Sequence, residues 1–202
     1  MAVVEVFSDI WCPFAYLGLK HAVAKRRELR APALHLRAWP LELVNGAPMD
    51  AAHVAANATA LRRQLAPSLF AGVDGWAFPA TTIPGLALVA EANATSLERG
   101  EAVGMRLREL LFEEGADIAD HALLADLARS FDLDPSCLER RDAVERDWHL
   151  GQARGVLGSP HFLAGASDAF CPGLDISRSD EGQLELGDRF AKLEDFLAGA
   201  FS

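Results

Sequence analysis

The chain has 202 residues, of which 50% are hydrophobic, so it can form one large domain or two small ones with a buried core. Its 19 basic and 29 acidic residues give a net charge of −10, which disfavours nucleic acid and anionic membranes as partners. Its three cysteines, an odd and sparse number, argue against a disulfide framework and fit a reducing compartment. The N-terminus lacks a basic leader, and no apolar run approaches the ~18 residues that span a bilayer, so we expect a cytoplasmic protein with no membrane partner.

The first forty residues predict a strand, a helix and a second strand. Residues 3–7 are β-branched and aromatic, which is typical of a buried strand. A helical pattern then runs from Pro13 to about Arg30, and apolar residues alternate with other side chains over residues 34–39. A crossover of this length usually joins parallel neighbours in one sheet.

The middle of the chain, residues 41–154, predicts helices and no convincing strand. Helical patterns cover five segments: residues 51–64, 85–93, 101–113, 121–131 and 134–154. A loop rich in glycine, proline and aromatic residues spans 66–84. Its Trp76 and Phe78 either line a cleft or pack on the surface.

The β pattern returns after residue 155. Residues 161–163 and 169–171 predict a hairpin around the turn residues 165–168, and 186–201 predict a closing helix after a polar stretch. The order is therefore β-α-β, a helical block, then β-β-α. We expect an α/β core made of residues 1–40 and 155–202, with residues 41–154 inserted as an all-helical domain.

Cys12 is the first candidate for chemistry. It stands where the first strand ends and the first helix begins, with Pro13 in the first helical turn. Unpaired backbone N–H groups and the positive end of the helix dipole favour a thiolate there, so we expect a lowered pKa and a nucleophilic sulfur. The ordinary alternative is a small buried apolar residue, since free cysteines are usually of that kind.

The second candidate is Pro160, which follows Gly158 and Ser159 at the start of the third strand. Only about 5–6% of X-Pro bonds in folded proteins are cis, so the sequence alone leaves this isomer open. His161 either acts as an acid or base near the site or points into the helical layer. Cys171 and Cys137 fit structural roles better.

Taken together, the Cys-Pro motif after the first strand and the proline-led third strand resemble the thioredoxin fold. The long helical insertion resembles its DsbA-like branch. Residues 7–18, FSDIWCPFAYLG, are similar to the active-site segment of FrnE-type oxidoreductases, as are the helical stretch 100–135 and the segment 155–162. The resemblance covers nearly the whole chain and implies an α/β, thioredoxin-like fold with a large all-helical insertion.

The resemblance also implies the residues of a site. Cys12 matches the attacking cysteine, Pro160 the cis-proline that lies across from it, and Ser159 a residue that lines the thiol site and contacts substrate backbone. The residues implied to contact a bound thiol are Trp11, Pro13, Phe14, Ser159 and Pro160. No tightly bound cofactor is implied beyond glutathione or another small thiol, and no cluster at ligand spacing predicts a metal site.

One departure from the family's pattern shapes the functional prediction. The second cysteine of the family falls on Ala15 here, so Cys12 cannot close a disulfide within the motif. A mixed disulfide on Cys12 then needs a small thiol such as glutathione or mycothiol, or Cys171 if the fold brings it near. We therefore expect a monothiol DsbA-family thiol-disulfide oxidoreductase that acts on a small-molecule thiol or disulfide.

Two alternatives stay open. The same superfamily contains 2-hydroxychromene-2-carboxylate isomerases and kappa-class glutathione transferases, whose Ser-Pro-Phe-Ser-Tyr segment is similar to residues 12–16 and activates bound glutathione. Cysteine in place of serine counts against this reading, because a thiol is the poorer hydrogen-bond donor. The other alternative is a binding module without turnover. The oligomeric state, a homodimer included, is also open.

Overall fold

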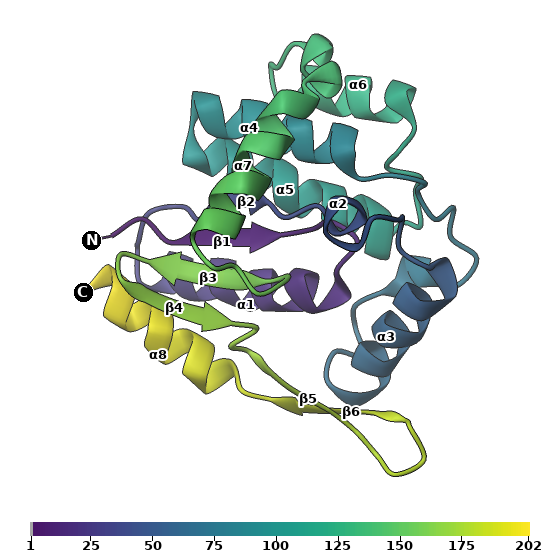
Figure 1. Ribbon diagram of the computed structural model, residues 1–202, viewed down its shortest axis with the longest axis vertical. Coiled ribbons are helices and arrows are strands. Elements are labelled where there is room, and N and C mark those ends of the chain that lie inside the picture. Colours follow the sequence, from purple (N-terminus) through teal and green to yellow (C-terminus); the bar gives the residue numbers. More distant parts are fainter. Residues whose placement is uncertain (1) are drawn as a thin grey trace.

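The computed structural model describes residues 2–202 and contains a four-stranded sheet with the order β2-β1-β3-β4 (Figure 1). The strands are β1 (Glu5–Ser8), β2 (His35–Ala38), β3 (His161–Ala164) and β4 (Ser167–Phe170). β1 pairs parallel with β2, as the crossover length predicts, and antiparallel with β3, which forms a hairpin with β4. The sheet is therefore assembled from the two ends of the chain.

Helices α1 (Pro13–Glu28) and α8 (Phe190–Phe201) lie together beside the sheet (Figure 1). Successive residues of a strand point to opposite faces, so Val6 joins the large core with Phe162, while Phe7 joins a smaller cluster on the other side. That smaller cluster includes Trp39 and is covered by Trp148 of α7 (Arg141–Ala153). The sheet is thus buried on both faces at β1 and β3, whereas the edge strand β4 is largely exposed.

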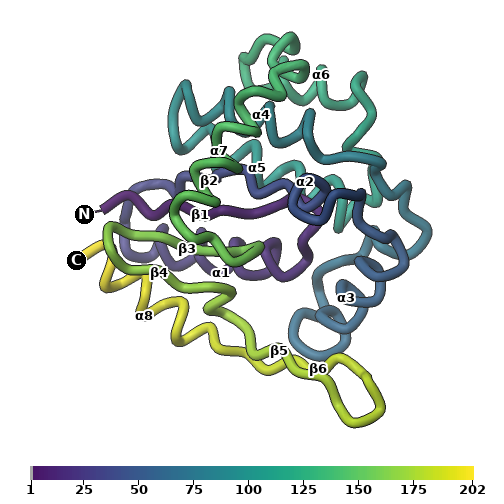
Figure 2. The backbone as a smooth tube through the Cα atoms, viewed as in Figure 1, coloured from purple at the N-terminus to yellow at the C-terminus, as the bar shows by residue number. Residues whose placement is uncertain are grey.

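Between β2 and β3 the described chain is helical, and Figure 2 shows it leaving the sheet and returning along α7. The elements before α7 are α2 (Leu41–Asn45), α3 (Ala51–Gln64), η1 (Ala71–Val73), α4 (Ile83–Thr95), α5 (Leu97–Phe112), α6 (His121–Ser130) and η2 (Pro135–Glu139). One core cluster joins side chains of the sheet with those of these helices. The division into an insertion over residues 41–154 and a core of the two flanking segments stays a prediction.

Side chains from three helices bond to the outer edge of the sheet at residues 34–38, on and beside β2. Glu101 of α5 accepts a backbone N–H at 3.0 Å, Asn93 of α4 donates to a carbonyl at 2.7 Å, and Asp147 of α7 accepts a second N–H at 3.1 Å. These bonds fix the helical block against the sheet. Within residues 2–202, no helix combines the length and the apolarity that crossing a membrane requires.

Two expectations about elements are wrong. Residues 174–188 form a second, two-stranded sheet, β5 (Leu174–Arg178) with β6 (Leu184–Asp188), so the closing helix begins at Phe190 rather than at residue 186. The short alternation of leucine with polar residues in β6 has the period of a strand. The helix expected over 134–154 is also divided: Arg140, with ψ of 64°, separates η2 from α7.

Candidate active site

Cys12 is the N-cap of α1, with backbone angles of φ −80° and ψ 108° and with Pro13 opening the helix. Its thiol donates to the carbonyl of Ser159 at 3.1 Å and accepts from the backbone N–H of Ala15 at 3.4 Å. The residue is only 6% exposed. Little of Cys12 is therefore accessible from solvent.

The structure brings Cys12, Ser159 and Pro160 together from opposite ends of the chain. The Ser159–Pro160 peptide bond is cis, as the resemblance implies. The Ser159 hydroxyl accepts from the backbone N–H of Asp9 at 3.0 Å, while its carbonyl accepts from the Cys12 thiol. Gly18 of α1 faces the Pro160 ring, since a Cβ there would lie 3.8 Å from the Pro160 Cγ. Ser159 thus links the loop after β1 to the Cys12 thiol.

The acidity of the Cys12 thiol differs from the expectation. Burial raises the pKa of Cys12, the hydrogen bonds of Ser159 and Ala15 act in the opposite direction, and the charge of Asp9 raises it again. The expected lowering from the helix N-terminus is therefore wrong, because it took no account of the closed surroundings of the sulfur. In the resting protein Cys12 is a thiol, consistent with its role as donor to Ser159.

Asp9 is a buried carboxylate beside the thiol. Its Oδ1 accepts from the backbone N–H of Trp11 at 3.1 Å and its Oδ2 from that of Leu41 at 2.5 Å. Burial raises the pKa of Asp9 to about 6, although these N–H groups and the cation of Arg108 favour the charged form. Asp9 therefore titrates just below neutral pH, in a position from which its charge acts on Cys12.

Arg108 of α5 is a site residue that the sequence reasoning missed. It is 1% exposed and donates to the Ser8 hydroxyl at 2.8 Å, the Asp9 carbonyl at 3.2 Å and the Gly104 carbonyl at 2.7 Å. Burial lowers the pKa of Arg108 to about 10, and the negative charge of Asp9 acts against that. Its position next to Leu107 on the buried stripe of α5 was the available signal, since an arginine there needs a buried partner.

The residues implied to contact a bound thiol differ in their exposure to solvent. Trp11 is fully buried and stacks on Phe78, with ring centroids 5.7 Å apart and an interplanar angle of 9°. It lies beneath the site rather than on its surface, and the half-buried Phe78 packs against it. Pro13 is buried, whereas Phe14 and Ser159 are half-buried and reach the surface.

The other two cysteines lie in different surroundings. Cys171 follows β4 with φ of +43°, and its N–H donates to the Pro160 carbonyl at 2.9 Å. The fold therefore brings Cys171 next to Pro160. Burial raises its pKa to about 12, with a further contribution from the charge of Cys12. Cys137 is buried in η2, within the helical block, and burial raises its pKa to about 11.

His161 has a structural role. The ring is 1% exposed, and its Nδ1 accepts from the N–H of Leu157 at 3.1 Å. Its Nε2 lies 2.8 Å from an Asp168 carboxylate oxygen, to which it donates because Nδ1 is the acceptor. Both nitrogens are occupied in holding the loop before β3, so His161 does not act as an acid or base on Cys12.

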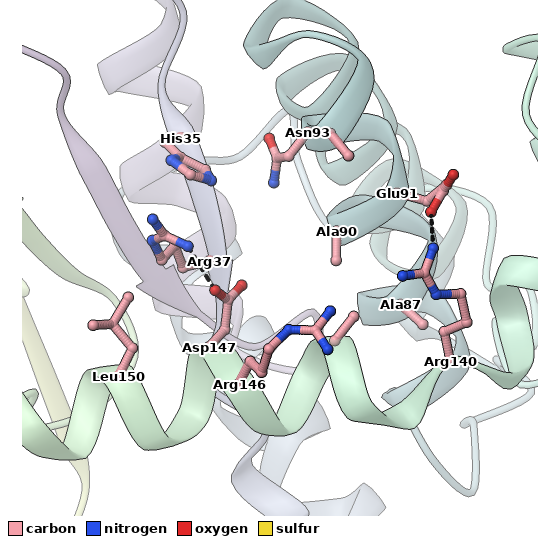
Figure 3. A pocket seen from close by; sticks show the side chains of 12 residues that line it. His35, Arg37, Ala87, Ala90, Glu91, Asn93, Arg140, Arg146, Asp147 and Leu150 are labelled. Carbon is pink, nitrogen blue, oxygen red and sulfur yellow. Dashed lines mark hydrogen bonds and ion pairs between the residues drawn. The ribbon is translucent and has the colours of Figure 1, made fainter.

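A cavity of about 390 Å³ lies away from Cys12, between β2, α4 and α7 (Figure 3). Four of its charged groups form two ion pairs, Arg37 with Asp147 at 2.7 Å and Arg140 with Glu91 at 2.7 Å. Arg146, which also lines it, pairs with Asp142 outside the cavity. The cavity contains none of the residues implied for the thiol site. Over residues 2–202, no group of three or more His, Cys, Asp or Glu side chains is placed to hold a metal ion.

A family model described as the DSBA-like thioredoxin domain matches residues 3–179, and the chain therefore belongs to that family. No curated protein matches the sequence. Among solved structures, the cytosolic disulfide reductase DsbM from Pseudomonas aeruginosa with GSH is similar, with a TM-score of 0.64, 16% identity and 98% of each chain covered. A 2-hydroxychromene-2-carboxylate isomerase is also similar, with a TM-score of 0.61, 17% identity, and 83% of this chain and 88% of that chain covered. These likenesses concern the fold.

Proposed function

We propose that this protein is a monothiol thiol-disulfide oxidoreductase with Cys12 as its nucleophile. The observation that carries the proposal is the position of the Cys12 sulfur, 3.1 Å from the Ser159 carbonyl beside the cis Pro160 and 3.4 Å from the Ala15 N–H. Such N–H donors stabilise a sulfur anion once the thiol ionises. Membership of the DSBA-like family supports chemistry on thiols and disulfides.

The reaction needs no metal. The Cys12 thiol loses its proton to solvent, and the thiolate attacks one sulfur of a small disulfide RSSR. A bond forms between Cys12 and that sulfur as the S–S bond breaks, and RS⁻ leaves. Cys12 is oxidised to a mixed disulfide, and half of the substrate is reduced to a thiol.

The mixed disulfide is resolved by a second small thiol, which we take to be glutathione or a related compound that is not held tightly. Its thiolate attacks the sulfur bound to Cys12, forms a new disulfide with it and releases the Cys12 thiolate. Ala15 supplies no competing sulfur, and burial raises the pKa of Cys171 to about 12, which keeps that thiol protonated at neutral pH. The similarity in fold to a cytosolic reductase whose structure contains GSH supports a cytoplasmic setting.

Intact-protein mass spectrometry after exposure to oxidised glutathione tests the proposal. Wild type and Cys137→Ser are expected to gain one glutathione adduct each, because Cys137 is buried far from the proposed site along the chain. Cys12→Ser is expected to gain none at neutral pH. An adduct that persists in Cys12→Ser, or a wild-type protein that stays unmodified, contradicts the proposal.

A glutathione-dependent isomerase or transferase is the second candidate. The similarity to a 2-hydroxychromene-2-carboxylate isomerase favours it, as does a helix N-terminus at Cys12 able to receive a thiolate. In this case the chemistry belongs to bound glutathione. It predicts saturable binding of reduced glutathione that survives Cys12→Ser, measured by calorimetry, and absence of such binding removes the candidate.

A further inference from the structure

A trough runs between α3 and the β5–β6 hairpin and reaches Phe14 of α1, two residues after Cys12. It consists of two cavities of about 290 and 390 Å³ that share His53, Asn57, Arg178 and Leu184, and Phe14 lines the smaller one. Figure 1 shows α3 and the hairpin next to each other, apart from the helical layer above the sheet. We call this feature the α3–hairpin trough.

The walls of the trough are basic in a chain that is strongly acidic overall. Arg178 and Arg63 line it together with His53, and no aspartate or glutamate lines either cavity. Arg178 donates to the Gly182 carbonyl at 3.0 Å, and neither arginine forms a salt bridge with another described residue. Two guanidinium groups without carboxylate partners therefore border one cavity of a protein whose net charge is −10.

The acidic residues of the hairpin lie farther out. A third cavity continues past Arg63 and Gln183 and is lined by Asp180, Glu181 and Glu185. These carboxylates disfavour an anion at the outer end of the trough. An anionic group is therefore best placed in the inner section, between Phe14 and Arg63.

The trough has fixed walls. The side chain of Gln64, at the end of α3, donates to the Leu184 carbonyl at 2.9 Å and accepts from the Leu186 N–H at 3.0 Å. It therefore bonds the edge of β6 as a neighbouring strand would. Because the hairpin is held against α3 in this way, the fold sets the spacing between the backbone positions of Arg178 and Arg63.

We propose that the α3–hairpin trough holds the carboxylate end of a small anionic thiol or disulfide while its sulfur reacts at Cys12. The inference rests on the proposed function and adds a substrate class to it. Phe14, two residues after Cys12, is the residue of the candidate site that lines the trough, and neither cavity is lined by Cys12, Ser159 or Pro160 themselves. The electrons and bonds move as in the exchange described above, and the two arginines only position and attract the anion.

The charge of the disulfide provides the test. Rates of Cys12 modification are measured by mass spectrometry with oxidised glutathione, which is anionic, with neutral hydroxyethyl disulfide and with cationic cystamine. The proteins compared are wild type, the double variant Arg63→Gln/Arg178→Gln, and Arg27→Gln. Arg27 is the matched control, because it is exposed in the last turn of α1, at the opposite end of that helix from Cys12.

In each protein, the rate with oxidised glutathione is divided by the rate with hydroxyethyl disulfide. Two exposed guanidinium groups are expected to raise this ratio roughly fivefold at low salt, so the double variant loses about that factor. The loss shrinks to about twofold near ~0.5 M salt, because screening shortens the reach of the charges. The rate with cystamine is expected to rise in the double variant, and Arg27→Gln is expected to match wild type.

Two results overturn the inference while leaving the proposed function intact: a ratio unchanged in the double variant, or an equal loss in Arg27→Gln, which assigns the effect to net charge alone. Failure of all three disulfides to modify Cys12 is a different result. It removes the proposed function, and the inference with it.

Discussion

Asp9→Asn offers the sharpest perturbation of the candidate site. The substitution keeps the shape of the side chain and removes its charge. It also leaves one amide oxygen for two backbone donors, the N–H groups of Trp11 and Leu41, which now bond to separate carboxylate oxygens. One hydrogen bond is lost at every pH, at a cost of about 1–3 kcal/mol.

The loss of the Asp9 charge has a second effect on stability, which depends on pH and favours the variant. Burial raises the pKa of Asp9 from 3.8 to about 6, so the folded protein binds a proton more tightly than the unfolded chain. The contribution of Asp9 to the free energy of unfolding is therefore largest below pH 4 and falls as the pH rises through 6, by about 3 kcal/mol in all for a shift of this size. Well above pH 6 the cost of burying the charged Asp9 carboxylate no longer changes with pH. The Asp9→Asn variant carries no charge at this position and does not incur that cost.

Urea denaturation of both proteins between pH 4 and pH 8 measures the difference directly. Asp9→Asn is expected to be less stable than wild type at pH 4. Between pH 4 and pH 8 its free energy of unfolding is expected to rise relative to that of wild type by most of ~3 kcal/mol. Alkylation of Cys12 by iodoacetamide is a second measurement. It is expected to be faster in the variant above pH 6, because the charge of Asp9 raises the pKa of Cys12.

A stability difference that does not change with pH refutes the reasoning. Asp9 would then ionise at its ordinary pKa, and burial would not be acting on its carboxylate. Slower alkylation of Cys12 in the variant, with unchanged folding, contradicts the assignment of Asp9 as a charge that opposes thiolate formation.

Two further predictions concern the surroundings of the thiol. Arg108→Met removes the donor to Ser8 and to the Asp9 carbonyl and leaves the buried Asp9 carboxylate without its cation. The free energy of unfolding, measured by urea denaturation at pH 8, is expected to fall by ~3 kcal/mol. A fall below ~1 kcal/mol contradicts this prediction. Since burial raises the pKa of Cys171 to about 12, its attack on a mixed disulfide at Cys12 is expected to be slow at pH 7 and about tenfold faster per pH unit above it. If mass spectrometry shows that a disulfide between Cys12 and Cys171 forms rapidly at pH 7, Cys171 is the resolving thiol instead.

The juxtaposition of Cys12 with Pro160 could be predicted only through the resemblance to a known fold. The residues themselves show a strand that leads into Cys-Pro and a helix, and a proline before the third strand, and this order carries the resemblance. The cis bond needed the resemblance as well, because the base rate alone argues against it.

Properties that depend on distant packing could not be predicted in the same way. The dipole at the start of a helix is visible in the sequence near Cys12, whereas the burial that raises the pKa of this thiol arises only when the chain packs in three dimensions. Even the hydrogen bond that opposes this rise comes from Ser159, at the other end of the chain. The β5–β6 hairpin was missed for a different reason. Most of its residues are exposed, so its alternation carries little hydrophobic signal, and Ile176 is itself 43% exposed.

The side chains that bond to residues 34–38 also bear on association between molecules. An open sheet edge is a template on which a strand from another chain can pair, and proteins avoid aggregation by blocking such edges. Here Glu101, Asn93 and Asp147 already occupy backbone groups that an incoming strand would need. Within residues 2–202 the opposite edge strand, β4, has no strand on its outer side, so a second copy can extend the four-stranded sheet only along β4.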